Sequence, residues 1–248
     1  MFCRTCLGPA GAGFARCYQC ELALSEAGGL LADVVAPTGY AVRGGPLAED
    51  LRQYKSDRGD QAVPAAGRLR DRLAAFLADQ GRAVWEMGGM TDGPGAVAIV
   101  PSGQGRPGAH PLVGLVRSCV ELPLVRLAVV APQAHTRGVN PGWVRIAGRV
   151  DGGALVQGGI DVLVVDDTWV SGGSAQSVAA ALKLAGARRV AVVALGRHVN
   201  PADPRSAAFV AAVRAVGQGG DRWPWRGVPS AIPTGRRDGG APPVIAEC

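Results

Sequence analysis

Short runs of consecutive apolar residues alternate along the chain with longer segments in which apolar residues recur at helical spacing. The runs predict strands buried on both faces, since such strands need no polar side; they cover residues 96–100, 125–131, 162–165 and 189–196. The helical segments carry one apolar stripe each, as in Leu69, Leu73, Phe76 and Leu77. We therefore predict an α/β fold with a doubly wound, mostly parallel sheet.

The pattern divides the chain into three parts. Residues 1–36 are short of apolar periodicity and rich in cysteine, residues 37–217 hold the strands and helices, and residues 218–248 are dominated by Gly, Pro and Arg. We expect a small N-terminal module, one α/β domain and a poorly ordered tail. Two further short strands, 143–150 and 154–157, could form a hairpin within the domain.

Residues 160–186 combine a strand with a site for an anion. The run at 162–165 is followed by Asp166 and Asp167, then by the small residues Ser171 to Ser174, and then by a helix that ends near Gly186. A helix N-terminus presents unpaired N–H groups and a partial positive charge, which suit a phosphate monoester.

The residues of that stretch have complementary roles. Gly172 and Gly173 let the backbone close around phosphate oxygens, and Thr168, Ser171 and Ser174 add hydroxyl groups. The two carboxylates can accept hydrogen bonds from vicinal hydroxyls or help to hold Mg²⁺. A phosphate beside a diol is the pattern of a ribose 5-phosphate, whereas the plain alternative is an ordinary strand-to-helix turn.

Two loops after other strands could complete such a site. Residues 101–108 follow the run at 96–100 and contain Ser102 and Arg106, which could grip a pyrophosphate. Residues 133–141 follow the next strand, and Arg137 there could stabilise a departing pyrophosphate. A plain connector remains the alternative for the first of these loops.

Four cysteines near the N-terminus have metal-ligand spacing. Cys3 and Cys6 form one Cys-x₂-Cys pair, and Cys17 and Cys20 form the second. Two such pairs supply the four thiolates of a structural zinc site, and a metal would stabilise so short a segment. Two disulfides are the alternative, which a reducing compartment disfavours.

Composition excludes few functions. The chain has 248 residues and a net charge of +6, and only Lys55 and Lys183 among its 26 basic residues are lysines. The arginines are scattered, so the charge fits a polyanionic small molecule or DNA without requiring either. No apolar stretch is long enough to span a bilayer and no signal peptide is evident, so we expect no membrane insertion and a cytoplasmic location.

The segment Val162 to Ser174 resembles the phosphoribosyl pyrophosphate (PRPP) binding motif of type I phosphoribosyltransferases. The resemblance implies that Asp166 and Asp167 lie along the ribose 2- and 3-hydroxyls and that Ser171 to Ser174 bind the 5-phosphate. Val170 stands where that family usually has Thr or Ser. By this resemblance PRPP, or another ribose 5-phosphate, is the expected ligand, with Mg²⁺ bound alongside PRPP.

The order of motifs over about residues 3–200 is similar to that of the competence protein F (ComF) family. It comprises the four cysteines, a short helix ending in Lys55, the Val-Pro-Ser loop at 100–102, an Arg-x-x-Asn loop at 137–140 and the Asp-Asp motif. The resemblance implies a type I phosphoribosyltransferase fold with an N-terminal zinc-ribbon module and a link to DNA uptake. The alternative is a non-catalytic protein whose zinc module binds DNA, such as single-stranded DNA, or competence proteins.

Overall fold

The structure is a computed structural model that describes residues 2–56, 60–102, 110–130, 138–149 and 159–211. Arg106, Arg137, the expected strand 154–157 and the expected tail 218–248 lie outside these ranges. The expected helix over 204–217 is described in part, as a 3-10 turn η4 (Pro204–Ser206) followed by helical residues 207–211.

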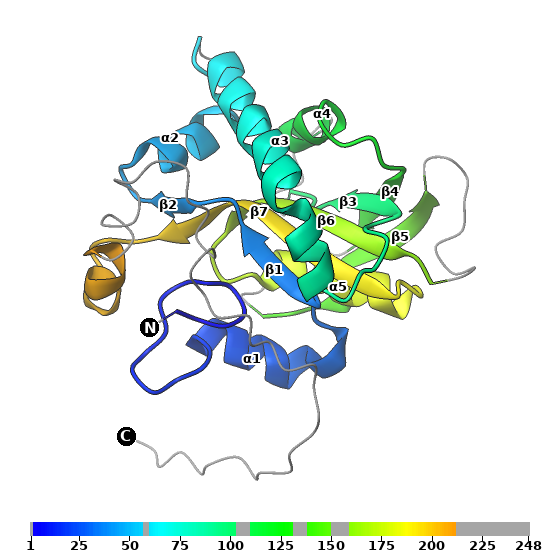
Figure 1. Cartoon of the computed structure of the whole chain (residues 1–248), viewed down its shortest axis with the longest axis horizontal. Helices are drawn as coiled ribbons and strands as arrows, with labels where there is room; N and C mark the ends of the chain where they lie inside the picture. The colour runs from blue at the N-terminus through cyan, green and yellow to red at the C-terminus, as the bar shows by residue number, and fades with distance from the viewer. Residues whose placement is uncertain (1, 57–59, 103–109, 131–137, 150–158, 212–248) are drawn as a thin grey trace.

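A single seven-stranded sheet forms the centre of the described chain (Figure 1). The strands lie in the order β1-β7-β6-β3-β4-β5, and β2 pairs with β7 beyond the end of β1. Every pairing is parallel except that of β4 with β5. The strands are β1 (Val34–Pro37), β2 (Tyr40–Val42), β3 (Ala96–Ile99), β4 (Leu124–Val129), β5 (Val144–Arg149), β6 (Asp161–Trp169) and β7 (Arg189–Val199).

Helices cover both faces of the sheet (Figure 1). One face is covered by α2 (Pro46–Gln53), α3 (Ala62–Met87) and α4 (Pro111–Arg117), and the other by α1 (Tyr18–Ala27) and α5 (Gly173–Leu184). Two short 3-10 turns, η1 (Gly28–Leu30) and η3 (Pro141–Trp143), lead into β1 and β5. The prediction of an α/β fold with a mostly parallel, doubly wound sheet is confirmed.

Side-chain alternation along β6 produces the two cores. Val162 and Val164 belong to the cluster that includes α5, whereas Leu163 and Val165 belong to the cluster that includes α3 and α4. Successive side chains of a strand point to opposite faces, so a strand covered on both sides is apolar throughout. This explains the continuous apolar run in the sequence.

The sheet reverses its winding direction between β3 and β6, which are hydrogen-bonded neighbours. From β3 the chain passes through α4 to β4, and from β6 it passes through α5 on the opposite face to β7. In open α/β sheets, the carboxyl ends of strands at such a reversal flank a crevice that commonly binds ligands. The loops after β3 and β6 are those that the sequence suggested.

β6 is longer than the sequence indicated. We expected the acid pair to end the strand, but pairing with β7 continues through Asp166, Thr168 and Trp169, opposite Ala194, Gly196 and Arg197. Aspartate has low strand propensity, and tertiary pairing overrides it here because β7 extends far enough to supply partners. The two carboxylates therefore lie within a strand.

The N-terminal segment packs directly on the domain. Cys3, Cys6 and Cys20 share a buried cluster with Val192 and Ala194 of β7, and the expected boundary at residues 36 and 37 falls inside β1. We refer to residues 2–27 as the cysteine module. Its separation from the α/β domain stays a prediction.

Candidate functional site

The β6–α5 loop (residues 170–172) makes a tight turn whose shape depends on Gly172. This residue has φ of +85°, a left-handed conformation that favours glycine. A Cβ at this position would also overlap the indole ring of Trp169, which is buried beneath the loop. The bulk of Trp169 is thus directed into the core, and the loop above it can stay compact.

α5 begins at Gly173, directly after this turn, so the amide groups of its first turn lie at the loop. The hydroxyl of Ser171 accepts a hydrogen bond from the Gly173 N–H over 3.4 Å. Ser177 closes the first turn by donating to the carbonyl of Gly173 over 2.6 Å. Residues 171–174 therefore lie together at a helix N-terminus, as the sequence predicted.

Asp167 is held by two side chains from the end of α2. The Tyr54 hydroxyl donates a hydrogen bond to Oδ2 of Asp167, and the Lys55 ammonium lies 2.5 Å from the same oxygen. Asp167 is buried, while the Lys55 side chain is about one-third exposed. Oδ2 of Asp167 therefore has both a hydrogen-bond donor and an ion-pair partner.

Asp166 lies in a different electrostatic environment. Burial, together with the neighbouring charge of Asp167, raises the pKa of Asp166 to about 8. Alternation along β6 directs adjacent side chains to opposite sides of the strand. At neutral pH, Asp166 is then largely protonated and Asp167 is paired with Lys55, so the three side chains together carry little net charge.

The charges of these side chains determine whether the acid pair could bind Mg²⁺ by itself. A hard divalent cation is usually held by ionised carboxylates together with substrate phosphates. A neutral Asp166 and a lysine-paired Asp167 do not form a protein-only magnesium site. The acid pair fits hydroxyl groups better, because a protonated carboxyl can donate a hydrogen bond and an ionised one can accept it.

The loop after β3 begins beside the acid pair. The N–H of Val100 donates a hydrogen bond to the carbonyl of Val165 over 3.0 Å, and Val165 directly precedes Asp166. Ser102 follows Val100 by two residues, so it lies at the start of this loop. Arg106, farther along this loop, lies outside the described residues. Its role, like those of Ser102 and Thr168, stays a prediction.

The Arg-x-x-Asn loop is described from residue 138 onward and is anchored on two helices. The N–H of Val139 donates to Glu26 of α1 over 2.8 Å, and the N–H of Asn140 donates to the Ser177 hydroxyl of α5 over 2.8 Å. The end of this loop therefore lies against the helix that starts at the candidate site. Arg137 lies outside the described residues.

Sequence reasoning missed two residues that shape this region, Tyr54 and Arg197. Arg197 is a buried residue of β7 whose guanidinium contacts the carbonyl oxygens of Trp169 and Val170. A charged residue shortly after the apolar run 190–195 was the available signal for Arg197. Tyr54 gave no such signal, because a tyrosine on the apolar face of a helix is usually part of the core.

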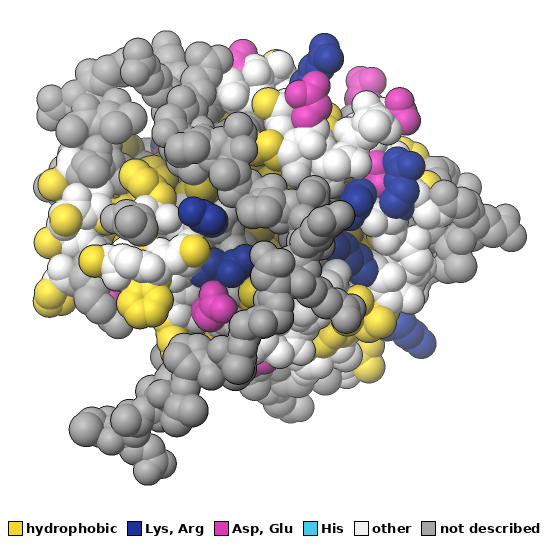
Figure 2. Space-filling model, turned by 60° about the horizontal axis from the view of Figure 1, so that its bottom comes forward, with side chains coloured by type: hydrophobic (Ala, Val, Ile, Leu, Met, Phe, Trp, Pro, Cys, Tyr) yellow, Lys and Arg dark blue, Asp and Glu magenta, His cyan; other side chains and the backbone are white. Residues whose placement is uncertain are grey.

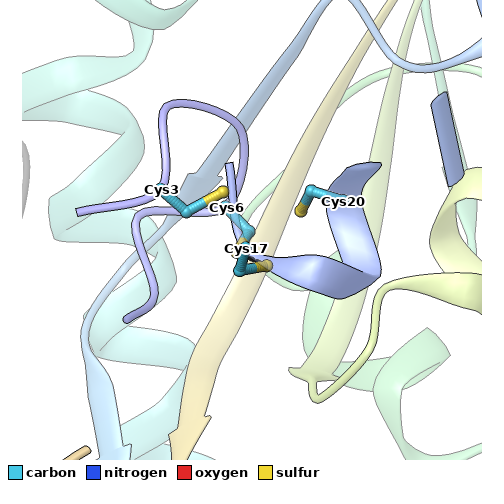
Figure 3. A group of neighbouring side chains, drawn as sticks. All are labelled: Cys3, Cys6, Cys17 and Cys20. Atoms are coloured by element: carbon cyan, nitrogen blue, oxygen red, sulfur yellow. Dashed lines mark hydrogen bonds between the residues drawn. The ribbon is translucent and has the colours of Figure 1, made fainter. Parts of the chain in front are cut away.

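The cysteine module brings Cys3, Cys6, Cys17 and Cys20 together (Figure 3). Their Sγ atoms all lie within 4.8 Å of one another, and those of Cys6 and Cys17 are 3.8 Å apart. None of the four is in a disulfide bond, and three of them are buried. Cys20 comes from α1 and Cys17 caps that helix, while the other two lie in the preceding turn.

These distances fit a tetrahedral metal site. Metal–sulfur bonds of about 2.3 Å in a tetrahedron place the sulfur atoms roughly 3.8 Å apart. Four thiolates so close together would repel one another without a cation. The residues present therefore match a closed four-cysteine site for an ion such as Zn²⁺, with no position left for a catalytic water.

Charged side chains are dispersed over the face of the molecule that Figure 2 shows. In Figure 2, which brings the lower part of Figure 1 forward, Lys and Arg side chains stand in separate groups, and acidic side chains lie beside some of them. Several arginines of the described chain are paired with acids, including Arg188 with Asp161 and Arg189 with Asp33. Among the described helices, none combines the length and apolar character needed to cross a bilayer.

The chain has little similarity to known proteins. No protein-family model matches the chain, and no curated protein matches it. Among solved structures, the purine phosphoribosyltransferase from Pyrococcus horikoshii Ot3 is similar over 55% of this chain and 88% of its own, with 16% sequence identity and a TM-score of 0.30. A likeness this weak assigns no function to the chain.

Proposed function

We propose that this protein binds a ribose 5-phosphate group, as in PRPP, at the carboxyl end of β6 and the N-terminus of α5. One observation carries the proposal: β6 brings Asp166 and Asp167 to the point where the sheet reverses, and the tight turn at Gly172 leads directly into α5. Carboxyl groups that could bind hydroxyl groups would then lie beside amide donors suited to a phosphate.

The residues would divide the ligand between them. Ser171 to Ser174 and the first amides of α5 would bind the 5-phosphate, and the acid pair would bind the ribose hydroxyls. Magnesium would arrive with the phosphates of PRPP, since the acid pair lacks the charge to hold it alone. Ser102 and Arg106, on the loop after β3, are the proposed contacts of the pyrophosphate.

Catalysis would be a phosphoribosyl transfer to a nitrogen acceptor. Such a transfer breaks the bond between the anomeric carbon and pyrophosphate, and binding both reactants in line could supply much of the rate. Arg137 is proposed to stabilise the leaving charge. The resemblance to the ComF family adds DNA uptake in the cytoplasm as the proposed setting, and zinc as the proposed metal of the cysteine module.

Calorimetry with ribose 5-phosphate, and with PRPP and Mg²⁺, tests the proposal. We expect saturable binding of one ligand per chain and at least about tenfold weaker binding in Asp167→Asn, because a hydroxyl loses a charged acceptor. Asp161→Asn is the matched control: it alters a buried, arginine-paired aspartate at the other end of β6. It should lower stability without changing ligand affinity. Absence of binding by the metal-loaded wild type would refute the proposal.

A second candidate is a non-catalytic protein that binds a partner through the cysteine module. Phe14 and Tyr18 in this module are 67% and 76% exposed, and Val170 at the loop lacks a hydroxyl. Binding of PRPP without pyrophosphate release across a panel of bases and amines would favour this alternative. A DNA partner would require an affinity that falls steeply with salt concentration.

A further inference from the structure

Arg197 connects two parts of the molecule that are distant in sequence. It lies in β7, directly opposite Trp169 of β6 and Tyr40 of β2, and only 7% of the residue is exposed. Its Nη1 atom lies 3.1 Å from the carbonyl oxygen of Trp169, 2.9 Å from that of Val170 and 2.9 Å from that of His198. A buried guanidinium therefore contacts the backbone where β6 passes into the β6–α5 loop.

These contacts fix the direction of the loop's amide groups. In a trans peptide, the carbonyl of one residue and the N–H of the next point to opposite sides. Because the carbonyls of Trp169 and Val170 point towards Arg197, the N–H groups of Val170 and Ser171 point away from the buried guanidinium. Successive N–H groups with a fixed orientation are what an anion-binding loop requires.

The guanidinium is seated against the cysteine module. A Cβ on Gly8 would lie 2.5 Å from Nη2, 2.6 Å from Nε and 2.9 Å from Cζ of Arg197, so the glycine backbone is in close contact with the group. The Nε atom is buried without a hydrogen-bond partner in the described structure. Packing against Gly8 thus helps to hold the guanidinium in place.

Gly8 belongs to the turn that presents the first two cysteines. Its carbonyl accepts a hydrogen bond from the Cys3 N–H over 2.8 Å, and the Leu7 N–H donates to the Cys3 carbonyl over 2.9 Å. Tyr40 ties the same turn to the sheet by donating to the Leu7 carbonyl over 2.9 Å. Any change that opens this turn therefore removes the packing contact between Gly8 and the Arg197 guanidinium.

We propose that Arg197 is a positioning residue that couples the cysteine module to the β6–α5 loop. It orients the loop's amide groups, and its own position depends on the closed turn Cys3–Gly8. The coupling makes the order of the loop depend on a metal held 150 residues or more away in sequence. The ligand-binding consequence rests on the proposed function, whereas the ordering of the loop does not.

Hydrogen exchange at residues 170–174, followed by mass spectrometry, tests the coupling on the metal-loaded full chain. We expect Arg197→Met to speed exchange of these amides roughly tenfold, the size of effect that loss of about 1.4 kcal/mol produces. Arg188→Met is the matched control, because it removes a bidentate arginine pair with buried Asp161 at the opposite end of β6. Equal loop exchange in the two variants would overturn the proposal.

A second variant alters the contact of Arg197 with the cysteine module. It keeps the coupling testable if Arg197→Met fails to fold. Gly8→Ala leaves all four cysteines in place but displaces the guanidinium. It should speed loop exchange while metal content stays at the wild-type value, and Gly29→Ala, which meets no atom within 4 Å, should not. Unchanged loop exchange in Gly8→Ala would count against the coupling.

Chelation of the metal completes the test. In the wild type, metal removal should weaken ribose 5-phosphate binding about tenfold, and in Arg197→Met it should have little further effect, because the coupling is already broken. Additive losses would overturn the proposal. If the loaded wild type binds no ribose 5-phosphate, the proposed function fails, and hydrogen exchange alone decides the role of Arg197.

Discussion

The Lys55 ammonium lies 2.5 Å from Oδ2 of Asp167, joining the end of α2 to the acid pair of β6. Tyr54 donates to the same oxygen. The two residues thereby contact a buried carboxylate, next to the carboxyl group of Asp166, whose pKa is raised to about 8 by burial. The acid pair is therefore two chemically different groups.

Replacing Lys55 by Met should destabilise the protein by about 1–3 kcal/mol, because it leaves a buried carboxylate without its cation. Lys183→Met is the control: Lys183 pairs with Asp33, which retains a second partner in Arg189. Urea denaturation at pH 7 measures both. Equal losses in the two variants would show that Lys55 has no special role at Asp167.

The raised pKa of Asp166 predicts a specific pH dependence. The folded state holds this proton up to about pH 8, whereas the unfolded chain releases it near pH 4. Asp166 therefore contributes stability that is fully present below pH 4 and is lost as pH rises to about 8, with a slope of up to about 1.4 kcal/mol per pH unit. Asp166→Asn should remove this component, as denaturation midpoints from pH 4 to 9 would reveal. Parallel pH profiles of mutant and wild type would contradict the assignment.

Gly172→Ala should destabilise the protein by more than the 1–2 kcal/mol that a left-handed conformation costs alone, because its Cβ also overlaps Trp169. Gly67→Ala, in the interior of α3 with no atom within 4 Å of its Cβ, should instead raise stability by about 0.5–1 kcal/mol. Thermal denaturation of both variants checks this contrast. A Gly172→Ala protein as stable as wild type would mean that the turn differs from the one described.

The sequence predicted those features of the fold that depend on residues close together in the chain, and it missed those that depend on distant residues. The apolar runs located the strands and the helical stripes located the helices. A strand buried on both faces is apolar throughout, and a helix buried on one face has apolar residues every three or four positions. No pattern among neighbouring residues marks the end of β6. It is set by the length of β7, whose residues Ala194, Gly196 and Arg197 lie some thirty positions later.

The candidate site likewise has residues that the sequence identified and contacts that it did not. Asp166, Asp167 and the loop at 171–174 were evident because they are contiguous and chemically distinctive. The contact between Tyr54 and Asp167 spans 113 positions in sequence, and neither residue type alone indicates it. The direction of the Trp169 side chain was likewise not evident from the sequence, and its ring is buried beneath Gly172.

The cysteine module should contain one metal ion per chain. Elemental analysis of the purified protein measures this, and Cys17→Ser should lower the content because it removes one of four ligands. Cys119→Ser is the control, since Cys119 lies outside the cluster, next to the carbonyls of Leu115 and Val116. A metal-free protein with two disulfides in the module would contradict the assignment.

Electron density after soaking crystals with PRPP and Mg²⁺ is the most direct test of ribose 5-phosphate binding. We predict a phosphate at the N-terminus of α5, contacting residues 171–174, and ribose hydroxyls within hydrogen-bond distance of Asp166 and Asp167. Density for PRPP at any other place, or no density at residues 166–174 at saturating concentration, would contradict the account.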